Sequence, residues 1–182
     1  MDNYIESVGY DLYVKLLSEA VLEERGEKPT SEAEATVDIK VSAHIPEKYI
    51  KVSSQRMEMY KKISLITDRD DMQDILDEFI DRFGEPPREV VALIRISLIR
   101  ALAARFGISR VEARDSSLIF VMEKPDLEIW SEVFASFKNI SFRPMGQNMA
   151  VFYRMGKGDE CENALSVLQA YEKTYNKLAE EK

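Results

Sequence analysis

The sequence has very few of the side chains that metal sites and nucleophilic catalysis require. Its 182 residues include one cysteine and one histidine, which excludes a structural zinc site because such a site needs several of these ligands. Cys161 cannot form an internal disulfide, which is typical of a protein in a reducing cytoplasm. His44 has no serine or cysteine partner in a nucleophile motif. We interpret it as an ordinary surface or turn histidine and predict no catalytic residue.

Long apolar runs and an excess of basic residues are also lacking. No stretch approaches about 18 consecutive apolar residues, and the first residues, MDNYIESVGYDLY, have neither the basic start nor the apolar run of a signal peptide. We therefore expect a cytoplasmic protein that does not bind a membrane. The net charge is −8, which argues against nucleic-acid binding because phosphate contacts need clustered Lys and Arg. The expected partner is another protein.

The apolar residues that are present predict an α+β fold. Hydrophobic residues make up 45% of the chain and charged residues 32%, a composition typical of a globular domain with a real core. Strict alternation predicts a strand over 36–43, and two pairs of short apolar segments predict local hairpins. Helical spacing of apolar residues is found over 10–24, 53–63, 69–83, 87–106, 127–137 and 159–179. Ser53 and Ser54 can cap the second of these helices, which is expected to turn Met57, Tyr60 and Ile63 inward. We expect these helices to pack on a small, mostly antiparallel sheet.

The clearest helical pattern lies over residues 69–83. Its apolar residues, spaced to form a single stripe, are Met72, Ile75, Leu76, Phe79, Ile80 and Phe83. Gly84 suits the left-handed position after a helix, and the two prolines that follow separate this helix from the next one. The next helix, 87–106, is apolar on most sides, so we expect it to be central and buried. Phe79, Ile80 and Phe83 are expected to share a core with Ile94 and Leu98.

The same segment carries a cluster of carboxylates. Residues 68–83 contain seven acids and only two arginines. Four of the acids share one helical face because they are spaced i, i+3, i+4 and i+7: Asp74, Asp77, Glu78 and Asp81. A calcium loop needs oxygens at alternate residues around a glycine turn, which a helix face does not offer.

Two interpretations of the acidic face remain open. A run of charge is usually a solvated helix face, and this is the simpler interpretation. The sharper one is a docking surface for a basic partner, because neighbouring like charges on a helix cost a few tenths of a kcal/mol per pair. Acids near the C-terminal end are also disfavoured by the helix dipole. Helix stability therefore does not explain them, and physical reasoning from the sequence alone does not decide between the two.

Four segments carry a resemblance to the C-terminal part of the bacterial transcription-repair coupling factor family (Mfd): VGYDLYVKLLSEAV at 8–21, VDIKVSAHIPEKYI at 37–50, RMEMYKKI at 56–63 and DEFIDRFGEPPREV at 77–90. Their order makes the resemblance specific, although the last 70 or so residues match by arrangement more than by motif. Both Walker motifs of the family are lacking, so we expect a piece that starts just after the second motor lobe. Residues 1–30 are then a helix and acidic linker that lead in from the motor, and 31–182 a C-terminal regulatory domain.

The resemblance implies a function. Members of the family are ATP-driven DNA translocases that push stalled RNA polymerase off damaged DNA and recruit excision repair through UvrA. ATP and Mg²⁺ are used by their motor domains, and the C-terminal domain has no catalytic activity and no cofactor. It packs against the N-terminal UvrA-binding domain of the same protein, masks that surface and represses the free protein. On this basis Glu78 and Asp81 are expected to bind the partner domain, with Asp74 and Asp77 as their neighbours on the same face.

Two other functions remain open. The chain could be an interaction module that binds RNA polymerase or another factor directly. It could also be an accessory domain of the motor that contacts DNA. The candidate cations for the second alternative are Lys51, Arg56, Lys61 and Lys62, or Arg95, Arg100 and Arg105 on the helix that we expect to be buried.

Overall fold

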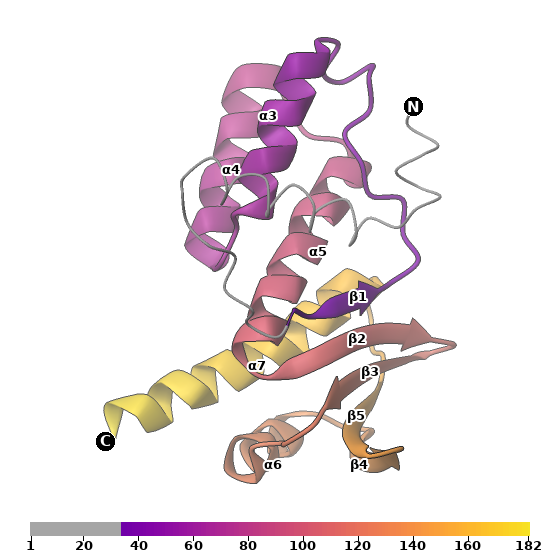
Figure 1. Cartoon of the computed structure of the whole chain (residues 1–182), viewed down its shortest axis with the longest axis vertical. Helices are drawn as coiled ribbons and strands as arrows, with labels where there is room; N and C mark the ends of the chain where they lie inside the picture. The colour runs from indigo at the N-terminus through magenta and orange to yellow at the C-terminus, as the bar shows by residue number, and fades with distance from the viewer. Residues whose placement is uncertain (1–33) are drawn as a thin grey trace. The chain divides into compact units, whose positions relative to one another are not determined.

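The structure is a computed structural model, and it describes residues 34–182. These residues form two compact units: Val41–Ala101, and residues 34–40 together with Leu102–Lys182. The helix expected over 10–24 and the linker expected over 1–30 lie outside the described residues. The described part contains five helices and five strands (Figure 1), and none of these helices is long and apolar enough to cross a membrane.

The first unit is helical. Helices α3 (Ser53–Ser64) and α4 (Arg69–Phe83) lie side by side (Figure 1). Helix α5 (Arg88–Arg105) begins after the two prolines and continues into the second unit. As expected, it is buried along most of its length, and its fully covered side chains include Leu93, Ile94, Leu98 and Ile99.

Helix α4 has the predicted bounds, and Gly84 follows it as predicted. The side chain of Asp68 accepts a hydrogen bond from the backbone N–H of Asp71 at 2.8 Å, which satisfies a donor that the first turn leaves free. Gly84 follows the helix with a φ of 85°, a conformation that favours glycine. Phe79 is fully buried and Phe83 half-buried, but Ile80 is 44% exposed. Its predicted place in the core is therefore wrong.

Helix α3 differs from the sequence prediction at its start. Its N-cap is Val52, which makes no capping hydrogen bond through its side chain, so the capping role expected for the serines that follow is wrong. Tyr60 and Ile63 are buried as predicted, whereas Met57 is exposed and Met59 is buried in its place. The hydroxyl of Ser97 on α5 donates to the carbonyl of Ile63 at 2.7 Å, which ties the end of α3 to α5.

The second unit contains a five-stranded sheet in the order β1-β2-β3-β5-β4. Its strands are β1 (Thr36–Asp38), β2 (Ile108–Arg114), β3 (Ser117–Met122), β4 (Ile140–Met145) and β5 (Asn148–Arg154). Both predicted hairpins are present, as β2–β3 and β4–β5. Among the described strands only β1 pairs in parallel, with β2, so the α+β fold with a mostly antiparallel sheet is confirmed.

Strand β1 is shorter than the predicted strand over 36–43. Exposed and buried residues still alternate up to Lys40, and Ala43 is buried. Pairing with β2 nevertheless ends at Asp38, and the chain passes from the second unit to the first after Lys40. Alternation reports which side of an extended segment is covered. It does not report whether a partner strand runs beside it.

Two helices of the second unit cover one face of the sheet. Helix α6 (Leu127–Ser136) begins after Asp126, and α7 (Glu160–Glu180) begins after Asp159 in a full capping box. The ring of Trp130 on α6 lies 6.3 Å from that of Phe120 on β3 and 5.0 Å from that of Tyr171 on α7. Burial raises the pKa of the Tyr171 hydroxyl to about 12, as expected for a phenol kept from water.

Candidate functional site

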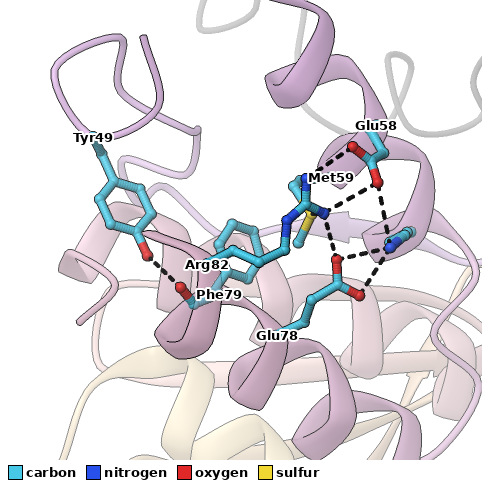
Figure 2. Close-up of polar contacts among 7 residues, drawn as sticks. Tyr49, Glu58, Met59, Glu78, Phe79 and Arg82 are labelled. Atoms are coloured by element: carbon cyan, nitrogen blue, oxygen red, sulfur yellow. Dashed lines mark hydrogen bonds and ion pairs between the residues drawn. The ribbon is translucent and has the colours of Figure 1, made fainter. Parts of the chain in front are cut away.

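The acidic residues of α4 divide between two sides of the helix. Glu78 lies on the side that faces α3, as Figure 2 shows. Its carboxylate oxygen Oε2 accepts a hydrogen bond from Lys62 Nζ at 2.7 Å and another from Arg82 Nη1 at 2.8 Å. The side chain remains 28% exposed. Glu78 therefore joins the two helices and is not a free surface charge.

Glu58 on α3 completes a cluster of four charges. Arg82 donates to both of its carboxylate oxygens at 3.1 Å, and Lys62 Nζ lies 3.4 Å from Oε1 (Figure 2). We call Glu58, Lys62, Glu78 and Arg82 the α3–α4 charge cluster. It contains two acids and two bases, and hydrogen bonds between ionised groups of this kind are shorter and stronger than neutral ones.

The charge cluster shifts the ionisation of its members. The hydrogen bond from Lys62 and the neighbouring Arg82 lower the pKa of Glu78, and the same contacts from Arg82 and Lys62 lower the pKa of Glu58. The bond to Glu78 raises the pKa of Lys62. Glu78 has opposite charges within the first unit, from α3 and from the next turn of α4, so an acid at this position does not by itself require a basic partner.

Three other acids of α4 make no hydrogen bond or ion pair with α3. Asp74, Asp77 and Asp81 are exposed, together with Ile80; we call these four residues the outer face of α4. Asp77 accepts a hydrogen bond from Gln73 Nε2 at 2.9 Å. Asp74 and Asp81 make no hydrogen bond or ion pair through their side chains with any other residue between 34 and 182. The outer face therefore combines three exposed acids, two of which have no partner among residues 34–182, with one exposed apolar side chain.

Three aromatic side chains pack together at the C-terminal end of α4. The ring of Tyr49 lies 6.2 Å from the rings of both Phe79 and Phe83. Its hydroxyl is 2.7 Å from the carbonyl oxygen of Gly84. The same hydroxyl is 3.4 Å from the carbonyl oxygen of Phe79 (Figure 2). Burial, with a smaller effect from Glu85, raises the pKa of Tyr49, so the hydroxyl keeps its proton and donates it to these carbonyls. These contacts fix the position of the last turn of α4, which carries Ile80 and Asp81 of the outer face.

Sequence reasoning did not find Tyr49, Glu58 or Lys62 as part of this region. A signal existed, because RMEMYKKI at 56–63 places Glu58 and Lys62 one helical turn apart. The pairing with α4 nevertheless depends on how the two helices pack, and spacing within one helix does not contain that information.

Three of the cations considered for DNA binding are held by protein groups. Arg56 Nη1 donates to the carbonyl of Ile50 at 2.8 Å, Lys62 belongs to the charge cluster, and Arg105 Nη1 lies 3.0 Å from a carboxylate oxygen of Glu172. Breaking such contacts would offset part of any attraction to phosphate. Within residues 34–182, no group of three or more His, Cys, Asp or Glu side chains is arranged to hold a metal ion.

Comparison with known proteins gives relatives over most of the chain. The transcription-repair-coupling factor of Staphylococcus aureus (strain USA300) is 38% identical over 151 residues, which cover 81% of this chain. That of Bacillus subtilis (strain 168) is 30% identical over 148 residues, which cover 80%. In both cases the chain spans only 13% of the relative's length.

Family and fold comparisons agree with these relatives. The family model of the TRCF domain matches residues 39–129, half of the chain. A crystal structure of the C-terminal domain of transcription-repair coupling factor matches with a TM-score of 0.69 and 21% identity, over 84% of this chain and 99% of that one. The chain belongs to the transcription-repair-coupling factor family, carries its TRCF domain, and has the fold of the family's C-terminal domain.

Proposed function

We propose that this chain is a non-catalytic regulatory domain that docks on the N-terminal UvrA-binding domain of the same cytoplasmic protein. The contact masks the surface that UvrA recognises and represses the ATP-driven translocase until RNA polymerase and DNA engage it. ATP and Mg²⁺ then act in the motor domains outside this chain. The observation that carries the proposal is the outer face of α4. Asp74 and Asp81 have no cation partner among residues 34–182, although α4 itself is held in place by Tyr49 and by the α3–α4 charge cluster.

The contacts of the four acids support different roles for them in this proposal. Asp81 makes the main contact with a basic partner surface, and Asp74 and Asp77 extend it along the helix. Glu78 holds α4 against α3 through Lys62 and Arg82, and only its exposed fraction of 28% is available to a partner. Ile80, 44% exposed, supplies apolar contact at the edge of the acids, as is common where polar interfaces also exclude water.

The energies suit a contact that opens and closes. An interface within one chain typically buries about 600–1,500 Å² and is more polar than a permanent one. With a local concentration of ~1 mM and an intrinsic Kd of ~1 μM, the closed state is favoured about a thousandfold, or ~4 kcal/mol. Engagement of polymerase and DNA can overcome a difference of that size. Exposed charges are screened over about 8 Å at physiological salt, so the contact weakens as salt rises.

The test compares charge reversal on the outer face with charge reversal elsewhere. In the full-length protein, Asp74→Lys with Asp81→Lys is expected to raise both UvrA binding and the ATPase rate without polymerase by about tenfold, because reversal turns attraction to a basic surface into repulsion. The control is Glu123→Lys, since Glu123 is an exposed acid of the second unit. Unchanged UvrA affinity and ATPase in a folded double variant, at low and at high salt, would show that the acids form a solvated face.

A direct binding assay separates the proposal from its alternatives. This 182-residue chain is mixed with the isolated N-terminal UvrA-binding domain, with RNA polymerase, and with duplex DNA at low salt. Binding to the N-terminal domain that the double variant weakens supports the proposal. Binding to polymerase alone would favour a direct interaction module, and a DNA gel shift would favour an accessory domain of the motor.

A further inference from the structure

The second unit presents a sheet face that is built differently from the one beneath α6 and α7. Side chains alternate along each strand, and the register places Phe120 and Phe142 on the face that contacts Trp130. The residues between them point the opposite way. We call this opposite side the second face; its central residues are Ile119, Val121, Ala150 and Phe152, with Met145 at the edge.

Arginines surround this apolar centre, and they differ in how they are paired. On β2, Arg110 and Arg114 each donate to Glu112 at 2.8 Å, and Arg110 also lies 3.1 Å from Asp38 on β1. Glu112 is only 5% exposed. This half of the second face is therefore close to neutral, and its arginines are occupied in holding a buried carboxylate, which is unfavourable without such partners.

The β4–β5 half of the second face carries cations without an acidic partner. Arg143 and Arg154 are both exposed, and neither makes an ion pair with any residue that the structure describes. Arg143 lies over the ring of Phe152, with its guanidinium carbon 4.5 Å from the ring centre. A protein with a net charge of −8 thus has an exposed positive strip beside a half-buried aromatic ring.

We propose that this strip binds an extended acidic segment of another protein. Arg143 lies opposite Ala150 in the register, and Ala150, Phe152 and Arg154 are successive positions of β5 on the same face. With a rise of about 3.4 Å per residue, the backbone positions of the two arginines are about 14 Å apart along the strand, with that of Phe152 halfway. The guanidinium of Arg143 extends over the Phe152 ring, so an apolar side chain of the peptide would pack against this stacked pair. An extended peptide has the same period, so acid, apolar and acid side chains at positions i, i+2 and i+4 match Arg143, Phe152 and Arg154.

The distribution of charge favours an acidic peptide over a nucleic acid. A polynucleotide carries a dense, continuous negative charge and is held by many cations, whereas this strip has two. The other half of the face is close to neutral, because Arg110 and Arg114 are paired with Asp38 and Glu112, so it offers no unpaired cation to phosphates that continued across the sheet. A short peptide meets only the β4–β5 half. This surface belongs to the second unit and involves none of the residues of the outer face of α4, so it stands independently of the proposed function.

The test uses the 182-residue chain with a synthetic probe, acetyl-GETVTEG-amide, and NMR shifts of its backbone amides. We expect shifts confined to β4 and β5, and about tenfold weaker binding in Arg143→Glu with Arg154→Glu, because two exposed attractions become repulsions. The matched control is Arg88→Glu with Lys157→Glu, which changes the net charge equally at exposed sites and should retain binding. The probe acetyl-GKTVTKG-amide should not bind.

Three results would overturn the proposal. Shifts that fall outside β4 and β5 would place the probe elsewhere. Equal weakening in the matched control would reduce the effect to net charge. Tighter binding of a 12-nucleotide single-stranded DNA to the same strands, or no shifts with any probe at millimolar concentration, would rule out an acidic-peptide surface. Unchanged dispersion of the amide signals in both double variants shows that they are folded.

Discussion

The two sides of helix α4 arise from the same fifteen residues and have opposite character. On the side toward α3, Phe79 is fully buried and Glu78 is held by Lys62 and Arg82. On the outer face, Ile80 is 44% exposed, and Asp81 has no partner in the described part of the chain. Phe79 and Ile80 are both apolar, and Glu78 and Asp81 are both acidic. Their different environments come from the packing of the first unit around α4.

The difference shows where stability and recognition are located on one helix. Groups on the side toward α3 have their interactions satisfied within the first unit, so changing them should alter the free energy of unfolding. Groups on the outer face have theirs unsatisfied, so changing them should alter binding and leave folding almost untouched. Paired substitutions on the two sides test this separation, and the apolar pair is expected to show the largest contrast.

Truncation of apolar residues on the two sides of α4 should give very different losses of stability. Phe79→Ala is expected to lower the free energy of unfolding by about 3–5 kcal/mol, because it removes a fully buried ring. Phe83→Ala, at a half-buried site, should cost about 1–2 kcal/mol, and Ile80→Ala less than about 0.5 kcal/mol. Urea unfolding of the three variants measures the losses. Equal losses for Phe79→Ala and Ile80→Ala would contradict the division of the helix into two sides.

Much of this region could be predicted from the sequence because its signals are local. The bounds of α4 and the break at Gly84 follow from propensity and turn chemistry, and the two hairpins from alternation. The exposure of Ile80 and the pairing of Glu78 could not be predicted, because an apolar stripe does not show how much of its width a neighbour covers. Both depend on α3, whose own inward residues were predicted only in part.

Charge reversal of Glu78 and of Asp81 should also change stability to different extents, with a smaller difference than for the apolar residues. Glu78→Lys is expected to destabilise the chain by about 2 kcal/mol, because it places three bases around Glu58 and removes the charge-assisted hydrogen bonds that Glu78 accepts from Lys62 and Arg82. Asp81→Lys should change stability by no more than about 0.5 kcal/mol, and in the stabilising direction, because a positive charge suits the C-terminal end of a helix. Thermal unfolding in low salt measures both. The contrast would be lost if Asp81→Lys proved as damaging as Glu78→Lys.

The smallest expected effect is a pH dependence that belongs to the α3–α4 charge cluster. Lys62 and Arg82 lower the pKa of Glu78 below its ordinary value of 4.5, so the folded state binds its proton less readily than the unfolded chain does. The resulting stabilisation is present above that value and is lost as the pH falls through the lowered pKa. Because the side chain is partly exposed, we expect about 0.5–1 kcal/mol.

Glu78→Gln should therefore be less stable than the parent at pH 6, and the difference should shrink as the pH falls from about 4.5 towards 3. Asp81→Asn, on the outer face, is the matched control, because it removes one carboxylate from the same helix without touching the α3–α4 charge cluster. Urea unfolding at a series of pH values measures both differences. If the difference in the free energy of unfolding between Glu78→Gln and the parent stayed the same down to pH 3, Glu78 would stabilise the contact between α3 and α4 by packing and not by charge.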